Sequence, residues 1–130
     1  VHYTANVERG IDTSGILTMD YTGFKAVSMA AKDCAAPARC IIQGTKGYIQ
    51  QKSTANCCGG ITFHPNEGKE EHYNLNGGRP REAAEFETFA RAMESGDQEL
   101  CTRMQDTSIA VSRVLTVARR SAGIRFPGER

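Results

Sequence analysis

The sequence of 130 residues lacks several features that would place it in a specialised class of protein. No apolar run approaches the roughly 20 residues that a membrane-spanning helix needs. The chain does not begin with an export signal. Its 16 Lys and Arg nearly balance its 15 Asp and Glu, so the basic stripe of a nucleic-acid-binding protein and a polybasic membrane tether are both missing. These absences predict a cytoplasmic protein that binds neither membranes nor nucleic acids.

The five cysteines, at positions 34, 40, 57, 58 and 101, show no pairing pattern. An odd number cannot be fully paired within one chain, and the sequence contains no Cys-x-x-Cys. A disulfide between the adjacent Cys57 and Cys58 would be strained. The spacing therefore predicts reduced thiols, as in cytoplasmic proteins. A metal site drawn from Cys57, Cys58, His64 and His72 is the disfavoured alternative.

Complete catalytic and nucleotide-binding motifs are also missing. The sequence contains no Gly-x-Ser-x-Gly, His-Glu-x-x-His, Gly-x-Gly-x-x-Gly or Gly-x-x-x-x-Gly-Lys-[Ser/Thr]. Asp12-Thr-Ser-Gly15 differs from the Asp-Thr-Gly of aspartic proteases by an inserted Ser. Gly44-Thr-Lys-Gly47 lies between two expected strands, whereas a phosphate loop needs a following helix whose N-terminus faces the anion. The residues alone therefore predict no catalytic, cofactor-binding or metal-binding side chain.

A few ionisable side chains remain to be placed. His64 and His72 fall on or near the two arms of one expected hairpin, where a cross-strand surface pair is favoured over a ligand or proton-transfer role. His2 is expected to be exposed at the start of the chain. Two groups of carboxylates are expected to be solvated, one in a first helical turn and one in a polar loop: Glu82, Glu85 and Glu87, and Glu67, Glu70 and Glu71.

The chain divides into residues 1–78, which have the pattern of strands and turns, and residues 79–123, which have the pattern of helices. The expected strands are 1–7, 16–22, 25–32, 39–43, 48–52, 61–64 and 72–75, with a loop at 10–15 and turns at 23–24, 44–47 and 65–68. Consecutive short strands joined by tight turns predict a mostly antiparallel sheet.

Two helices are expected after the strands. Pro80 suits the first turn of one helix, Gly96 suits its end and Asp97 suits the N-cap of the next. Apolar and small residues recur at helical spacing: Ala83, Phe86, Phe89 or Ala90, and Met93, then Leu100, Met104, Ser108, Val111, Leu115, Ala118 and Ala122. Strands followed by helices predict an α+β fold, a mostly antiparallel open-faced sheet with helices on one face.

Both faces of the expected strands carry apolar residues. Alternation places Leu17, Met19, Tyr21, Val27 and Met29 on one face, and Ile16, Ala26, Ala30 and Cys40 or Ile42 on the other. Because two helices can cover only one face, the other would expose a large apolar patch. The pattern therefore predicts a homodimer or higher oligomer formed through the sheet.

Four stretches, taken in order, resemble the C-terminal domain of the Gfo/Idh/MocA family of NAD(P)-dependent oxidoreductases. They are Arg9-Gly-Ile-Asp-Thr-Ser-Gly15 with the strand at 16–21, Phe24-Lys-Ala-Val27, Cys40-Ile-Ile-Gln-Gly-Thr-Lys-Gly-Tyr-Ile49, and the closing helices and tail over 85–127. The resemblance covers nearly all of the chain. It implies a single domain over residues 1–130 with the fold of a dihydrodipicolinate reductase-like C-terminal domain.

The resemblance also implies a function for a longer parent protein. Enzymes of this family transfer a hydride between NAD or NADP and a sugar, polyol or related hydroxy compound, using a catalytic Lys, a His and a dinucleotide turn. None of these motifs occurs in this sequence, and no N-terminal Rossmann domain is present in it. The chain alone is therefore expected to be inactive, to bind no cofactor, and to supply a substrate-site wall and an oligomer contact. The alternative is a stand-alone β-sheet binding or dimerisation module.

Overall fold

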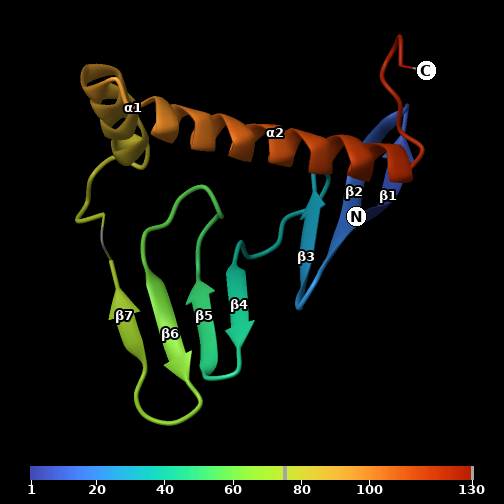
Figure 1. The fold of residues 1–130 in the computed structure, drawn as a ribbon. Helices are drawn as coiled ribbons and strands as arrows, with labels where there is room; N and C mark the ends of the chain where they lie inside the picture. Colours follow the sequence, from blue (N-terminus) through green and yellow to red (C-terminus); the bar gives the residue numbers. More distant parts are fainter. Residues whose placement is uncertain (75, 130) are drawn as a thin grey trace. The chain divides into compact units, whose positions relative to one another are not determined.

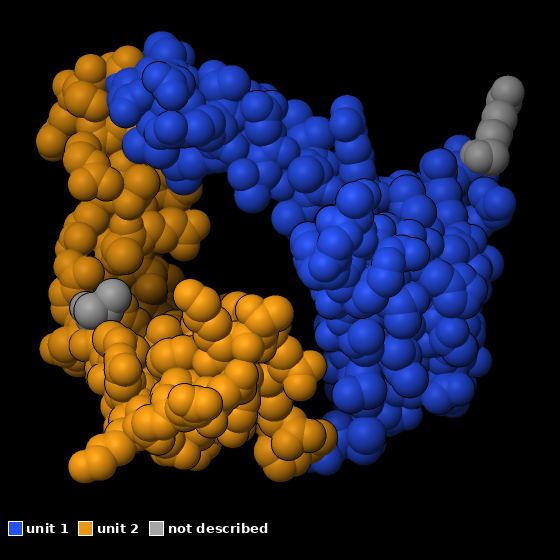
Figure 2. Space-filling model, turned by 60° about the horizontal axis from the view of Figure 1, so that its bottom comes forward, with its two compact units in different colours: residues 1–35, 97–130 blue, residues 36–96 orange. Residues whose placement is uncertain are grey.

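The computed structural model describes residues 1–74 and 76–129. Figure 2 distinguishes two compact units, residues 1–35 with 97–130 (unit 1) and residues 36–96 (unit 2). Within these described residues, seven strands and two helices confirm the α+β class and the antiparallel pairing. The prediction of one continuous sheet is wrong, because the strands form a three-stranded and a four-stranded sheet. The break falls in the segment that contains Pro37, which has no backbone N–H to offer a ladder.

Unit 1 contains a meander of β1 (His2–Glu8), β2 (Ile11–Tyr21) and β3 (Phe24–Ala31), shown in blue tones in Figure 1. Arg9 and Gly10 form the first turn with φ angles of 53° and 78°. Two successive positive φ angles are typical of the tight type I′ hairpin. Because these two residues suffice for the turn, the strand begins at Ile11, and the predicted loop over 10–15 is wrong.

A β-bulge at Thr13 changes which residues of β2 share a face of the three-stranded sheet. Asn6 pairs with Ser14 but Val7 pairs with Asp12, so Thr13 has no partner in β1. Simple alternation would place Asp12 on the same face as Ser14. The extra residue reverses that alternation, and Asp12 therefore lies on the face that carries Tyr3.

The pairing of β2 with β3 corrects the predicted faces of the sheet. Leu17 lies opposite Ser28, and Ile16 lies opposite Met29. Residues directly opposite each other share a face, so Met29 is on the face of Ile16 and not on that of Leu17. The two-residue turn between Tyr21 and Phe24 determines this register. The alternation of side chains along one strand does not show which residue of the neighbouring strand lies opposite.

Helix α2 (Gln98–Ser121) covers one face of the three-stranded sheet with its C-terminal half. Asp97 caps its first turn, as predicted, by accepting a hydrogen bond of 2.9 Å from the Leu100 amide. At the other end, the Tyr3 amide on edge strand β1 donates to the Ser121 hydroxyl at 2.9 Å. Ala118 of the predicted stripe is buried, whereas Leu115 is 59% exposed. The stripe is therefore only partly covered by the sheet.

Unit 2 contains the meander β4 (Cys40–Gly44), β5 (Gly47–Gln51), β6 (Ile61–Pro65) and β7 (Glu71–Tyr73), followed by α1 (Ala83–Ser95). The predicted hairpin over residues 44–47 is confirmed. Gly96 ends α1 in a left-handed conformation, also as predicted. The helix begins at Ala83, after a turn in which the Ala83 amide donates to the Pro80 carbonyl. The predicted strand end at Leu75 lies outside the described residues.

Little of either unit is buried. Among residues 1–74 and 76–129, only Ala92 and Ala118 are buried apolar residues. The chain exposes 10638 Å². Two fully separate compact domains, each of half this mass, would together expose about 8,200 Å². Apolar side chains of α1 are also largely exposed to solvent, and Met93, for example, is 78% exposed. Each unit therefore presents apolar surface that it does not cover itself.

Candidate functional site

The two histidines of unit 2 lie on paired strands but contact different partners. His64 stacks on Tyr48, its partner across β5 and β6, with ring centroids 4.3 Å apart and planes inclined by 11°. His72 lies opposite Thr62, and its Nδ1 is 3.0 Å from the Thr62 hydroxyl. The predicted cross-strand surface pair of His64 with His72 is therefore wrong, because the register places His64 opposite Tyr48 and His72 opposite Thr62.

His64 is the more enclosed of these side chains. Its side chain is 14% exposed, and its Nδ1 is 2.8 Å from a Glu70 carboxylate oxygen. An ionised carboxylate accepts hydrogen bonds only, so this contact places a proton on Nδ1. Nε2 is buried and has no hydrogen-bond partner among the described residues. The stack on Tyr48 and the contact with Glu70 hold the ring in one orientation, which fits a structural role.

The cysteines and the acidic clusters do not assemble into a site. All five cysteines are free thiols in the structure. Within residues 1–74 and 76–129, no three His, Cys, Asp or Glu side chains come together as ligands for a metal ion. Five of the six predicted solvated carboxylates are exposed, whereas Glu82 is half-buried. Glu82 pairs with Arg81, and Glu87 pairs with Arg79 at 3.0 Å.

The described residues do not fit a nicotinamide dinucleotide. Such a site uses a helix N-terminus, reached from a strand through a Gly-rich turn, to bind the pyrophosphate. The N-terminus of α2 is occupied by the Asp97 carboxylate, which would repel a phosphate. Helix α1 begins after Glu82 and carries Glu85 in its first turn. Gly44 and Gly47 flank a β-hairpin turn and not the start of a helix.

An ionic cluster that the sequence reading missed lies in unit 1, where the β-bulge places Asp12. Its carboxylate accepts hydrogen bonds from the Tyr3 hydroxyl at 2.9 Å and from Lys32 Nζ at 3.1 Å. These two donors, Lys32 first, hold the pKa of Asp12 below its ordinary value. Burial, and then the bond to Asp12, raises the pKa of Tyr3. The cluster leaves Asp12 ionised and its charge compensated at neutral pH.

A second ionic cluster joins the end of α2 to the chain that follows it. Arg119 makes two parallel bonds to the Glu129 carboxylate and a third, of 2.9 Å, to the Ile124 carbonyl. Its guanidinium also lies 3.9 Å from the centre of the Phe126 ring. The bonds from Arg119, followed by the Phe126 amide at 3.0 Å, lower the pKa of Glu129 to about 2. The tail is thereby attached to the helix.

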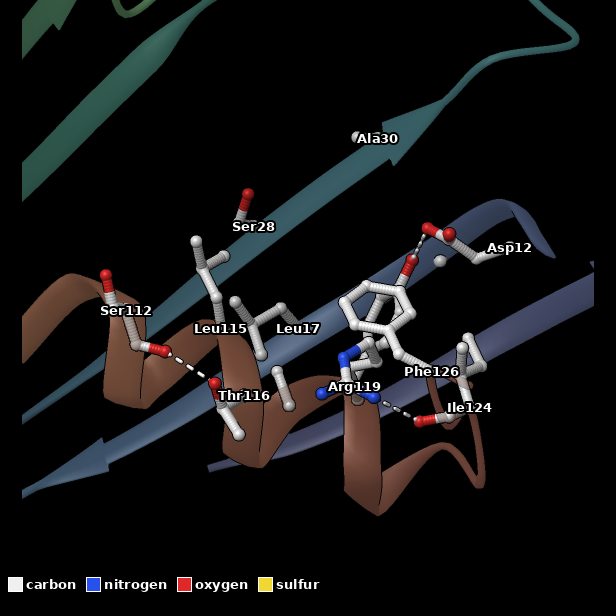
Figure 3. A pocket seen from close by; sticks show the side chains of 13 residues that line it. Asp12, Leu17, Ser28, Ala30, Ser112, Leu115, Thr116, Arg119, Ile124 and Phe126 are labelled. Carbon is white, nitrogen blue, oxygen red and sulfur yellow. Dashed lines mark hydrogen bonds between the residues drawn. The ribbon is translucent and has the colours of Figure 1, made fainter. Parts of the chain in front are cut away.

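The two clusters border a cavity of about 540 Å³ between α2 and the three-stranded sheet, drawn in Figure 3. Leu17 from β2 and Leu115 from α2 line its middle, and Phe126 lies beside Arg119. Ser28 and Ala30 line it from β3. The sequence offered one indication of this site, namely the small residues that alternate along the helix-facing side of β3.

Neither helix, within the part of the chain that the structure describes, has the length and apolar content needed to cross a membrane. Compared with known proteins, the chain matches no family model and no curated protein sequence.

Proposed function

We propose that the chain is the C-terminal, substrate-binding and association domain of an NAD(P)-dependent oxidoreductase of the Gfo/Idh/MocA type. In this proposal the parent enzyme acts on a sugar, polyol or related hydroxy compound, and a separate Rossmann domain holds the cofactor. The observation that carries the proposal is the uncovered apolar face of the three-stranded sheet. Ile16, Val27 and Met29 share this face, away from α2, and Met29 is 73% exposed.

Three further features support this role over that of a complete enzyme. The strands precede the helices, the sheets are antiparallel meanders, and the Gly44–Gly47 hairpin has the place that the resemblance gives it. The described residues do not fit a dinucleotide, so hydride transfer would need residues from elsewhere. We therefore expect NADH fluorescence to show no saturable change when this chain alone is added.

A second candidate is a stand-alone module that dimerises or binds a partner through the same face. The uncovered face is common to both candidates, and the order of strands and helices together with the Gly44–Gly47 hairpin favours the first. The reading frame upstream of the Val1 codon separates them, because the proposal requires a strand and a Gly-rich turn to be encoded there. An initiation codon next to the Val1 codon, with no Rossmann sequence, would support the module and contradict the oxidoreductase.

Association through the face can be tested on the chain itself. Light scattering should give a mass of about 28 kDa, twice the 14.2 kDa of one chain. Met29→Glu places a charge in the apolar face and should return the mass to that of one chain. Met93→Glu is the matched control, since Met93 is also an exposed methionine but lies on α1. A single species of 14.2 kDa at high concentration would rule out the sheet interface.

A further inference from the structure

We propose that the cavity between α2 and the three-stranded sheet is a binding site for an uncharged, mainly apolar small molecule. Its volume of about 540 Å³ lies within the range of about 300–1,000 Å³ that is usual for small-molecule sites. All of its lining residues belong to unit 1. This proposal goes beyond the oxidoreductase assignment and does not depend on it.

The cavity arises because small residues face the helix where large ones would fill a core. Gly15 on β2 and Ala30 on β3 lie opposite each other in the sheet, and Ser28 follows on the same side. Helix–sheet interfaces are normally packed to the density of organic crystals. Here Leu115 projects from α2 into the cavity and still remains 59% exposed. Apolar surface is therefore left uncovered by protein.

Gly15 is also required for the shape of the cavity wall. A Cβ at this position would collide with the ring of Tyr3, which lies against the glycine. The ring is held there because its hydroxyl donates to Asp12 at 2.9 Å. One end of the cavity is thereby fixed by a rigid aromatic side chain. The opposite wall is formed by Leu115 and Thr116, which lie within the long helix α2 and not at its ends.

The charges around the cavity indicate that its ligand is neutral. Asp12 is compensated by Lys32 at 3.1 Å, and Arg119 is compensated by Glu129. A charged ligand would lose its hydration without gaining an unpaired counter-charge, which is costly in an apolar site. The Ser28 and Ser112 hydroxyls also line the cavity and can bond one or two carbonyl or hydroxyl oxygens. These groups fit an apolar molecule with few polar atoms.

Nile red, a neutral and solvatochromic dye, is a suitable probe of this site. Titration should give saturable binding of one dye per chain with a blue-shifted emission. Ala30→Leu extends a side chain into the cavity and should weaken binding at least about tenfold. Ser112→Leu should do the same from α2, where leucine favours the helix, so a folding defect in one variant leaves the other informative.

Ala31→Leu is the matched control, because it makes the same change one residue along β3, on the opposite face. It should leave dye binding unchanged. Amide chemical shifts on adding the dye should move at Leu17 and Ala30 and not at Val27. Non-saturable binding, equal affinity in the Ala30→Leu and Ala31→Leu variants, or shifts confined to the Ile16–Met29 face would overturn the proposal. The proposal would also be overturned if Ala30→Leu changed the oligomeric mass and left dye binding unchanged. That result would mean that a segment of another chain, and not a small molecule, fills the cavity.

Discussion

The two units hold their sheets together by contacts of very different sequence separation. In unit 1, the Tyr3 amide bonds to Ser121 across 118 positions, and Asp12 bonds to Lys32 across 20. In unit 2, the side-chain hydrogen bonds among the described residues span shorter stretches of chain, such as 10 positions for Thr62 with His72 and at most 21, for the Asn66 side chain with the Thr45 carbonyl. Local pairs form at a small cost in chain entropy, whereas distant pairs need most of the chain to be in place. Unit 1 is therefore the unit whose geometry depends on the complete chain.

The largest expected effect is in unit 2, at the turn between β4 and β5. Gly47 has a φ of +143°, and a Cβ there would collide with the His64 carbonyl and the backbone of Pro65. Because backbone atoms cannot move aside, Gly47→Ala should destabilise this sheet by about 2–4 kcal/mol. Hydrogen exchange of the β5 and β6 amides measures the loss.

Gly44, on the other side of the same turn, is the control for that variant. A Cβ at Gly44 would come no closer than 3.6 Å to the Gly47 carbonyl oxygen, which is ordinary contact. Gly44→Ala should change the free energy of opening of the four-stranded sheet by less than about 0.5 kcal/mol. Similar losses of stability in Gly47→Ala and Gly44→Ala would show that the close approach of backbone atoms at Gly47 is not what makes a side chain costly there.

The corresponding substitution in unit 1 should have a smaller effect. Gly15→Ala collides with a side chain, that of Tyr3, which can rotate away at the expense of its bond to Asp12. The loss should be about 1–2 kcal/mol, the usual value of such a bond. The pKa of Tyr3 should also fall toward its ordinary value, since burial and Asp12 raise it. Tyrosine-labelled NMR titration reports this change.

A double-mutant cycle identifies the cause of that loss. In a Tyr3→Ala background no ring lies against residue 15, so Gly15→Ala should cost almost nothing. An undiminished cost in this background would mean that Gly15 is needed for the strand itself and not for Tyr3.

The attachment of the tail in unit 1 should depend on pH. The pKa of Glu129 is about 2 in the folded chain, below its ordinary value of 4.5. A lowered carboxyl pKa stabilises the folded form fully above about pH 4.5, and this stabilisation is lost as the pH falls toward 2. The protection factor of the Phe126 amide, which donates to Glu129, should fall as the pH is lowered across this window.

Glu129→Gln should remove that pH dependence of the protection factor and lower the protection of the Phe126 amide at neutral pH. Glu99→Gln is the control, because it removes only an exposed pair with Arg103 at 3.4 Å on the same helix. A Phe126 protection factor that still falls between pH 4.5 and 2 in Glu129→Gln would assign the effect to another group.

The smallest expected effect concerns His64 of unit 2. His64→Phe keeps an aromatic ring against Tyr48 and removes the buried Nε2, but it loses the contact with Glu70. These changes oppose each other, and stability should alter by less than about 1 kcal/mol. His64→Ala also loses the stack and should cost about 1–2 kcal/mol more. Urea unfolding of the two variants measures both free energies of unfolding. Equal losses in His64→Phe and His64→Ala would show that the stack on Tyr48 does not stabilise the sheet.

The local elements could be predicted because each depends on residues close together in the sequence. Asp97 caps α2 and Gly96 ends α1 because a cap needs only its own turn of helix. The hairpin at Gly44–Gly47 likewise follows from four residues. The α+β class follows from the order of these elements, so all of these features can be predicted from the amino-acid order alone.

The candidate site could not be predicted in the same way. The face on which Met29 lies depends on the length of the turn between Tyr21 and Phe24, and the position of Asp12 depends on a bulge at Thr13. Side chains alternate with a period of two, so a single inserted residue exchanges the faces, and no periodicity shows where the insertion falls. The cavity further requires Leu115 to meet Leu17 from nearly 100 positions away. These features become visible only in the folded chain, because they depend on strand register and on packing between distant segments.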